Sequence, residues 1–151
     1  MDKKKSIYMD CCCLNRPGDD QTQDKIRIES DTIMAILYKC FYGPWKLVGS
    51  DIVEYEIMKN PDILKRNKAF HLYSVKKENI VLNDYIKKRA LEIQEYKLTL
   101  MDSLHFASAE YGNVDVLLTV DKELIKFSEG INSALKVENP INWFMKEIEN
   151  G

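Results

Sequence analysis

The sequence lacks the features that define several classes of protein. Its first apolar run, Ile7-Tyr8-Met9, stops at Asp10 and is too short for a membrane span or a signal-peptide core. Neither GxGxxG nor GxxxxGK occurs, so the common nucleotide-binding loops are missing. With 4 prolines and 6 glycines in 151 residues, no Pro-, Gly- and Ser-rich tract divides the chain. We therefore expect a cytoplasmic protein without membrane contact, folded as one domain over residues 1–151.

The cysteines are few and poorly spaced for metal or redox chemistry. Cys11, Cys12 and Cys13 are consecutive and Cys40 stands alone, so the chain has no CxxC pair for a zinc site or a thioredoxin-like centre. If the run lies on a strand, alternation turns Cys11 and Cys13 away from Cys12, and the three thiols cannot surround one metal ion. We interpret the cysteines as small, buried apolar residues.

Short apolar segments alternate with helical patterns along the chain. Helices are predicted from about residue 24 to 41, from 51 to 58, from about 60, and over 83–97, 99–112, 122–130 and 139 onward. Strands are predicted over 6–10, 46–49, 114–119 and 134–137. Strands separated by helices favour a parallel sheet covered on both faces. We therefore expect an α/β fold, a three-layer α/β/α sandwich with a central, mostly parallel sheet.

Acidic residues follow several of the predicted strands. Asp10 closes the first, Glu54 lies one turn into the helix after the second, and Asp121 follows the strand VDVLLT. Asp102 lies in the first turn of the helix that precedes that strand. Ligands of open parallel sheets bind beyond the carboxyl ends of the strands, so these carboxylates are expected to meet there. An oxygen-only cluster suits Mg²⁺ or Mn²⁺ better than zinc.

Each carboxylate also has a purely structural explanation. Asp10 can be a solvated strand end, and Glu54 can complete a capping box. Asp102 is favoured by the helix dipole, and Asp121 can cap the helix that begins at Lys122. Four unrelated caps have no reason to share one end of one sheet, which favours the metal-site hypothesis.

The ordered set of motifs resembles the PIN domain family. The resemblance is carried by a strand that ends at Asp10, by Ser50-Asp51-Ile52-Val53-Glu54, by MDSLHFASA (residues 101–109), by LLTVD (117–121) and by VENP (137–140). It spans nearly the whole chain. It implies a PIN-like nuclease domain, a metal-dependent ribonuclease, and for many bacterial members the toxin of a toxin–antitoxin pair.

The resemblance also implies roles for individual residues. Asp10, Glu54, Asp102 and Asp121 match the acidic quartet of the family and would act as catalytic residues and ligands of Mg²⁺ or Mn²⁺, with Asp10 and Asp121 as the principal ligands. Thr119 and Ser50 match supporting positions. We expect Glu56 to point away from the site, because it lies two helical residues beyond Glu54.

Basic residues are concentrated in the middle of the chain. From residue 57 to 90, nine Lys and Arg residues face three acids, although the whole chain carries a net charge of −2. Such a segment can follow an RNA backbone, and a solvated helix face is the alternative explanation. The candidate RNA-binding residues are Lys59, Lys65, Arg66, Lys68, Lys87, Lys88 and Arg89.

The leading hypothesis is a metal-dependent endoribonuclease with RNA as substrate and an antitoxin or a second copy of the chain as protein partners. His105, three residues after Asp102, falls near the same helix face and can reach the site. The first alternative is a non-catalytic PIN-like module that binds nucleic acid or protein. A phosphatase with Asp10 as nucleophile is disfavoured because Cys12 replaces the second Asp of its DxD motif.

Overall fold

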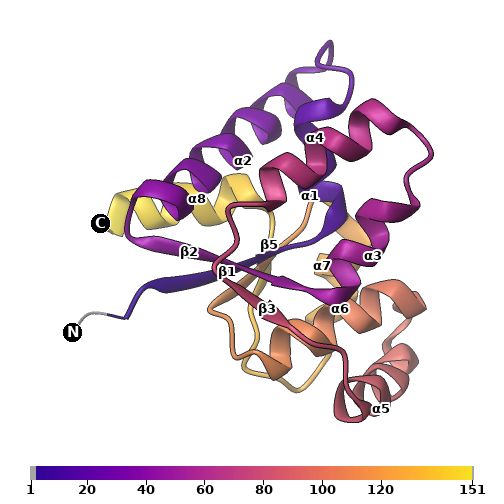
Figure 1. Cartoon of the computed structure of the whole chain (residues 1–151). Coiled ribbons are helices and arrows are strands. Elements are labelled where there is room, and N and C mark those ends of the chain that lie inside the picture. The colour runs from indigo at the N-terminus through magenta and orange to yellow at the C-terminus, as the bar shows by residue number, and fades with distance from the viewer. Residues whose placement is uncertain (1–2, 151) are drawn as a thin grey trace.

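The computed structural model describes residues 3–150, in which five strands form one sheet in the order β3-β2-β1-β4-β5 (Figure 1). All neighbouring strands are parallel. The parallel α/β fold predicted from the sequence is therefore confirmed. The strands are β1 (Lys5–Met9), β2 (Trp45–Ser50), β3 (Glu78–Ile80), β4 (Val116–Leu118) and β5 (Val137–Glu138).

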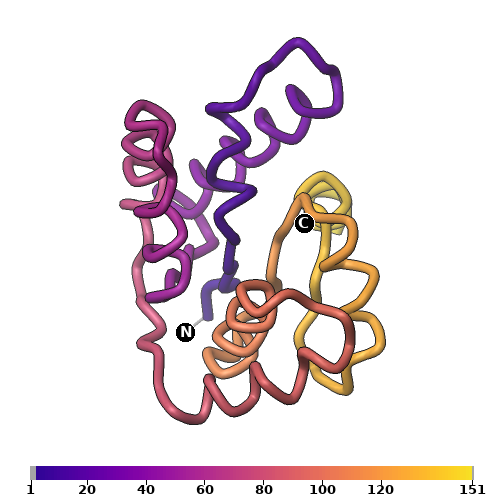
Figure 2. The backbone as a smooth tube through the Cα atoms, turned by 90° about the vertical axis from the view of Figure 1, so that its right-hand side faces the viewer, coloured from indigo at the N-terminus to yellow at the C-terminus, as the bar shows by residue number. Residues whose placement is uncertain are grey.

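Helices cover both faces of the sheet. Figure 1 shows α2, α4 and α8 on one side and α5 and α6 on the other. In Figure 2 the N-terminal segment runs through the centre of the trace, between the α3–α4 pair and the C-terminal segments. This is the predicted three-layer arrangement. The helices are α1 (Cys11–Asn15), α2 (Asp24–Tyr42), α3 (Asp51–Lys59), α4 (Ile63–Tyr73), α5 (Asp84–Ile93), α6 (Leu100–Tyr111), α7 (Lys122–Ser128) and α8 (Pro140–Asn150), with short 3₁₀ helices at Arg16–Gly18 and Gln94–Tyr96.

The hydrophobic core lies on both faces of the central strands. Residues 7–9 of β1 and 116–118 of β4 are all buried, as expected for parallel strands with helices above and below. Trp45 at the start of β2 packs against Trp143 of α8, with ring centroids 4.9 Å apart. The centre of the sheet is thus a rigid base for the loops at its carboxyl end.

Three local features differ from the sequence prediction. Cys11, Cys12 and Cys13 form the first turn of a helix and not the end of a strand, so the expected strand alternation is wrong there. Strand β3 was not predicted, because its three residues are mostly polar and exposed and give no alternating pattern. Strand β5 is shorter than expected and begins at Val137.

The end of β2 is fixed by a close approach between Gly49 and Tyr73. A Cβ atom on Gly49 would lie 2.2 Å from the Tyr73 hydroxyl, so only glycine leaves room for it. That hydroxyl accepts a hydrogen bond from the Ser50 backbone N–H at 3.0 Å and donates to the Ser50 carbonyl at 3.1 Å. Helix α4 is thereby attached to the strand that leads into α3.

Within residues 3–150, no helix combines the length and the apolar character that crossing a membrane requires.

Candidate active site

The carboxyl ends of the two central strands bring Asp10 beside Thr119. Met9 of β1 is the register partner of Leu118 of β4, and the Asp10 backbone N–H donates to the Leu118 carbonyl at 3.3 Å. Both side chains are buried, Asp10 at 4% exposure and Thr119 at 0%. The pairing of β1 with β4 therefore determines the centre of the site.

Asp10 is both a helix cap and a buried acid. Its Oδ1 atom accepts a hydrogen bond from the Cys13 backbone N–H at 3.2 Å and another from the Cys12 thiol at 3.0 Å. The Cys12 sulfur also lies 3.4 Å from the Thr119 hydroxyl oxygen. Burial raises the pKa of Asp10, while these hydrogen bonds oppose that rise. The cysteine run thus supports the site through Cys12, while Cys11 and Cys13 are buried as predicted.

Asp102 and Asp121 reach the same edge of the sheet from the first turn of α6 and the N-terminus of α7. The Thr99 hydroxyl caps α6 by accepting the Asp102 backbone N–H at 3.1 Å. Asp121 caps α7 by accepting the Glu123 and Leu124 backbone N–H groups. Burial, followed by the charges of Asp121 and Asp10, raises the pKa of Asp102 to about 6. The three aspartates are therefore near enough to repel one another, as the sequence predicted.

The fourth acidic residue at this edge is Glu56, and the expectation that it points away is wrong. The His105 Nε2 atom contacts the Glu56 carboxylate. Burial raises the pKa of the Cys11 thiol to about 12, and the charges of Glu56 and Asp10 both add to that rise. Glu54 is exposed, and its charge acts instead on Tyr73, outside the acidic cluster. Residues two apart on a helix do face different ways, but it is Glu56 that faces the site.

A sequence signal for Glu56 was present. It lies four residues after Ile52 and three after Val53, both of which are buried, so it continues the inward stripe of α3. We define the acidic cluster as Asp10, Glu56, Asp102 and Asp121.

Tyr8 is a second residue that sequence reasoning missed. It lies on β1 two residues before Asp10 and is fully buried. Its hydroxyl is 2.7 Å from the Ser50 hydroxyl oxygen and 2.7 Å from His105 Nδ1. Burial raises its pKa well above the usual tyrosine value, so it remains a neutral hydrogen-bonding group. Only its place on a buried strand distinguishes it in the sequence.

The two predicted supporting residues, Ser50 and Thr119, lie at the ends of β2 and β4. Ser50 is fully buried and caps α3 by accepting the Val53 backbone N–H at 3.1 Å. The Thr119 hydroxyl accepts the Asp121 backbone N–H at 3.0 Å. Both hydroxyls thus set the direction of a segment that carries an acidic residue.

The predicted RNA-binding residues do not form one continuous track. Figure 1 shows α4 and α5, which carry most of them, at opposite ends of the molecule. Lys65 pairs with Asp19, and Lys68 donates to the Pro17 carbonyl at 2.8 Å, close to the segment that follows Asp10. The other candidates make different contacts or none of this kind: Lys59 lies over the Tyr55 ring, Arg66 donates to the Asn60 carbonyl, Arg89 pairs with Glu110 and Glu92, and Lys87 and Lys88 are exposed.

Among residues 3–150, no three His, Cys, Asp or Glu side chains already converge to hold a single metal ion. The chemistry of the acidic cluster nevertheless fits a hard divalent cation. All four members are carboxylates, and the Cys12 thiol keeps its proton to donate to Asp10. The mutual repulsion that raises the pKa of Asp102 is an interaction that a cation would relieve.

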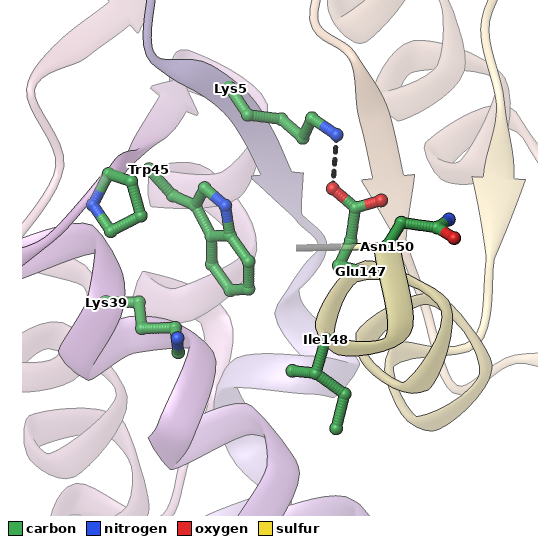
Figure 3. A pocket seen from close by; sticks show the side chains of 7 residues that line it. Lys5, Lys39, Trp45, Glu147, Ile148 and Asn150 are labelled. Atoms are coloured by element: carbon green, nitrogen blue, oxygen red, sulfur yellow. Dashed lines mark hydrogen bonds and ion pairs between the residues drawn. The ribbon is translucent and has the colours of Figure 1, made fainter.

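A hollow of about 500 Å³ lies at the opposite end of the strands (Figure 3). It is lined by Lys5 and Trp45, which begin β1 and β2, and by the end of α8, where Glu147 pairs with Lys5. Lys39 lies over the Trp45 ring at 5.3 Å. Because its charges are paired and the acidic cluster lies at the other edge, this hollow is not the candidate active site.

Comparison with solved structures finds the same fold in several proteins, among them members of toxin–antitoxin systems. A toxin–antitoxin complex from Klebsiella pneumoniae contains a chain with 20% sequence identity and a TM-score of 0.60, over 89% of this chain and 97% of that one. VapC20 of Mycobacterium tuberculosis, a toxin that cleaves the sarcin–ricin loop, has 12% identity and a TM-score of 0.56 over 78% of this chain and 92% of its own.

VapBC2 of Rickettsia felis, bound to a DNA fragment from its promoter, contains a chain with 18% identity and a TM-score of 0.55, over 88% of this chain and 98% of that one. No protein-family model matches the sequence, and no curated protein matches it. The structures establish a PIN-like fold, which confirms the resemblance at the level of the fold.

Proposed function

We propose that this PIN-like chain is a Mg²⁺- or Mn²⁺-dependent endoribonuclease. The observation that carries the proposal is the acidic cluster, whose members come from four separate segments near the carboxyl ends of β1 and β4. Burial and neighbouring carboxylates raise the pKa of Asp102 to about 6, so the charged form of this residue is destabilised in the folded protein. Such strain in a protein site is typical of function.

The residues of the site have different roles in the proposed phosphodiester hydrolysis. Asp10, Glu56, Asp102 and Asp121 would hold the cation through their oxygens, with Glu56 in the place first predicted for Glu54. A bound Mg²⁺ or Mn²⁺ would lower the pKa of a water molecule and neutralise charge on the leaving oxygen. The Cys12 thiol and the Cys13 backbone N–H orient the Asp10 carboxylate, and the Thr119 hydroxyl orients the segment that carries Asp121.

The decisive experiment combines chelation with Asp10→Asn. Cleavage of a mixed RNA substrate should require Mg²⁺ or Mn²⁺, stop with EDTA, and fall below detection in Asp10→Asn, with circular dichroism confirming that the variant is folded. Undiminished cleavage by Asp10→Asn would refute the assignment of the site. A folded wild type that neither cleaves RNA nor binds Mn²⁺ in calorimetry would favour the alternative, a non-catalytic binding module.

An antitoxin as protein partner is supported by an exposed apolar groove between α2 and α4. The groove has a volume of about 450 Å³ and is lined mainly by apolar side chains, among them Met34, Tyr38, Phe41, Tyr42 and Leu72. Tyr38 and Tyr42 are 64% and 70% exposed. A contiguous apolar surface of this kind usually marks a protein-binding site.

The toxin role predicts growth arrest when the chain is expressed, relieved by a small protein encoded in the adjacent reading frame. Asp10→Asn should abolish the arrest, and Tyr38→Ser with Tyr42→Ser should abolish the relief. Harmless expression of an active nuclease would argue against a toxin. Relief that persists in the double variant would place the antitoxin elsewhere on the surface.

A further inference from the structure

Four side chains from four different elements form a continuous buried chain of hydrogen bonds. It runs from Ser50 at the end of β2 to Tyr8 on β1, then to His105 on α6, and ends at Glu56 on α3. Ser50 and Tyr8 are fully buried and His105 is 1% exposed, while the Glu56 side chain is 30% exposed. The chain therefore leads from the interior of the protein to its acidic cluster.

The donors and acceptors of this chain fit one direction. The Glu56 carboxylate only accepts hydrogen bonds, so the contact with His105 requires a proton on Nε2. In a neutral imidazole the Nδ1 atom then accepts, and the Tyr8 hydroxyl is its donor. Ser50 already accepts the Val53 backbone N–H at 3.1 Å, which leaves its own O–H free to donate to Tyr8. Each hydroxyl group and ring nitrogen in this series of hydrogen bonds is then assigned as a donor, an acceptor or both.

We propose that Ser50, Tyr8 and His105 form a relay that fixes His105 as the Nε2–H tautomer and thereby aims the Glu56 carboxylate at the acidic cluster. Tyr8 and His105 are positioning residues in this scheme. A 180° flip of the imidazole would replace both hydrogen-bonding nitrogens by carbons, so the Tyr8 hydroxyl prevents it. The Tyr8 ring also meets the imidazole edge-on, with centroids 5.7 Å apart and planes at 76°.

The functional effect of this relay rests on the proposed function, because the orientation of Glu56 affects activity only when the acidic cluster binds a cation. Hydrogen-bonding partners that orient metal ligands typically contribute roughly ten- to a hundredfold to metal affinity. The tautomer of His105 does not depend on metal or on RNA cleavage. The two parts of the proposal can therefore fail separately.

Two closely matched tyrosine variants of the protein can test the relay. Tyr8→Phe and Tyr73→Phe each remove a buried tyrosine hydroxyl that bonds to Ser50, but only the Tyr8 hydroxyl touches His105. Each substitution leaves the former partners of a buried hydroxyl without those hydrogen bonds, so both variants are expected to lose some stability. A difference between them therefore reports the contact with His105 and not the general cost of losing a hydroxyl.

The experiment uses the full chain labelled with ¹⁵N-histidine. Two-bond proton–nitrogen correlation spectra give the protonation of each imidazole nitrogen, and the exposed His71 provides an internal reference. We expect a proton on Nε2 and a bare Nδ1 for His105 in the wild type and in Tyr73→Phe, and loss of this single state in Tyr8→Phe. A wild-type His105 protonated on Nδ1, or on both nitrogens, would overturn the relay.

Calorimetric titration with Mn²⁺ tests its consequence. Affinity should fall about tenfold in Tyr8→Phe and stay within twofold of wild type in Tyr73→Phe. His105→Gln keeps an amide donor for Glu56 and should bind Mn²⁺ more tightly than His105→Leu, so equal affinities would reduce His105 to a packing role. If the wild type binds no Mn²⁺, the proposed metal site fails, while the spectra still decide whether the relay exists.

Discussion

Two buried carboxylates in this protein, Glu29 and Asp10, are held in opposite ways. The Glu29 side chain is fully buried, with Oε1 accepting from the Arg16 guanidinium at 3.0 Å and Oε2 accepting from the Asn139 amide at 3.0 Å. Asp10 is almost as buried, but its hydrogen-bond donors are a thiol and a backbone N–H, neither of which is charged. Glu29 has the Arg16 cation as its partner, whereas the charge of Asp10 acts on a further carboxylate, Asp102.

The difference distinguishes a structural carboxylate from a functional one. Glu29 connects α2 to the 3₁₀ turn at Arg16 and to Asn139, which precedes α8, and so it holds distant segments together. In the acidic cluster, by contrast, burial and the charges of Asp121 and Asp10 all raise the pKa of Asp102. A buried charge with a complete set of partners stabilises one geometry, while an uncompensated group of charges is suited to a cation that arrives from solution.

The largest expected effect concerns which glutamate of α3, Glu56 or Glu54, acts in RNA cleavage. Glu56→Gln should lower the RNA cleavage rate by roughly 10²–10³-fold, the range found when one group is removed that stabilises charge in a transition state. Glu54→Gln, two residues away and exposed, is the matched control and should cleave within about twofold of wild type. Both rates are measured at saturating Mn²⁺. The opposite result would restore the original assignment of Glu54.

As a structural carboxylate, Glu29 should contribute to the stability of the fold and not to the rate of RNA cleavage. Glu29→Gln should lower the free energy of unfolding by about 2–3 kcal/mol, because it leaves Arg16 without its buried partner. Urea denaturation measures this change, and cleavage per folded molecule should be unchanged. Asp10→Asn should show the reverse: no loss of stability and no cleavage. A Glu29→Gln protein as stable as wild type would mean that Arg16 and Asn139 find other partners.

The sequence predicts site residues that belong to local patterns, but not those that are defined by tertiary contacts. The strand that ends at Asp10 and the capped helix with Asp102 are local patterns, so their placement at the same edge of the sheet was predictable. The choice between Glu54 and Glu56 depends on which stripe of α3 is buried, a tertiary property, and in the structure it is Glu56 that contacts His105. Tyr8 carries no pattern of its own, since its importance arises from contacts with residues 42 and 97 positions away in the sequence.

The burial of Asp102 and its repulsion by neighbouring carboxylates should be visible in the pH dependence of stability. The raised pKa of Asp102, about 6, means that the folded state keeps a proton that the unfolded state loses between about pH 4 and 6. Stability from this group therefore falls as the pH rises through that window, and the penalty is complete above it.

Asp102→Asn removes this penalty. In the absence of divalent metal the variant should be more stable than wild type by about 1 kcal/mol at pH 8, a value reduced for the partial exposure of the group. The two proteins should be equally stable near pH 4. Thermal melts in EDTA across this range provide the measurement. A variant less stable than wild type at pH 8 would show that Asp102 is a structural carboxylate of the same kind as Glu29.

The smallest expected effect concerns which lysine residues bind an RNA phosphate near the acidic cluster. Lys65 and Lys68 of α4 lie beside the turn that follows α1, and α1 begins directly after Asp10. Lys87 and Lys88 adjoin Arg89, which pairs with Glu110 at the opposite end of α6 from Asp102. Replacing the α4 pair with alanine should weaken RNA binding in EDTA a few-fold and reduce the salt dependence by roughly 0.7 per lost phosphate contact. The α5 pair is the matched control and should change neither quantity. Because Lys65 and Lys68 already contact Asp19 and the Pro17 carbonyl, each must exchange a protein contact for a phosphate, which is why their effect should be the weakest of the series.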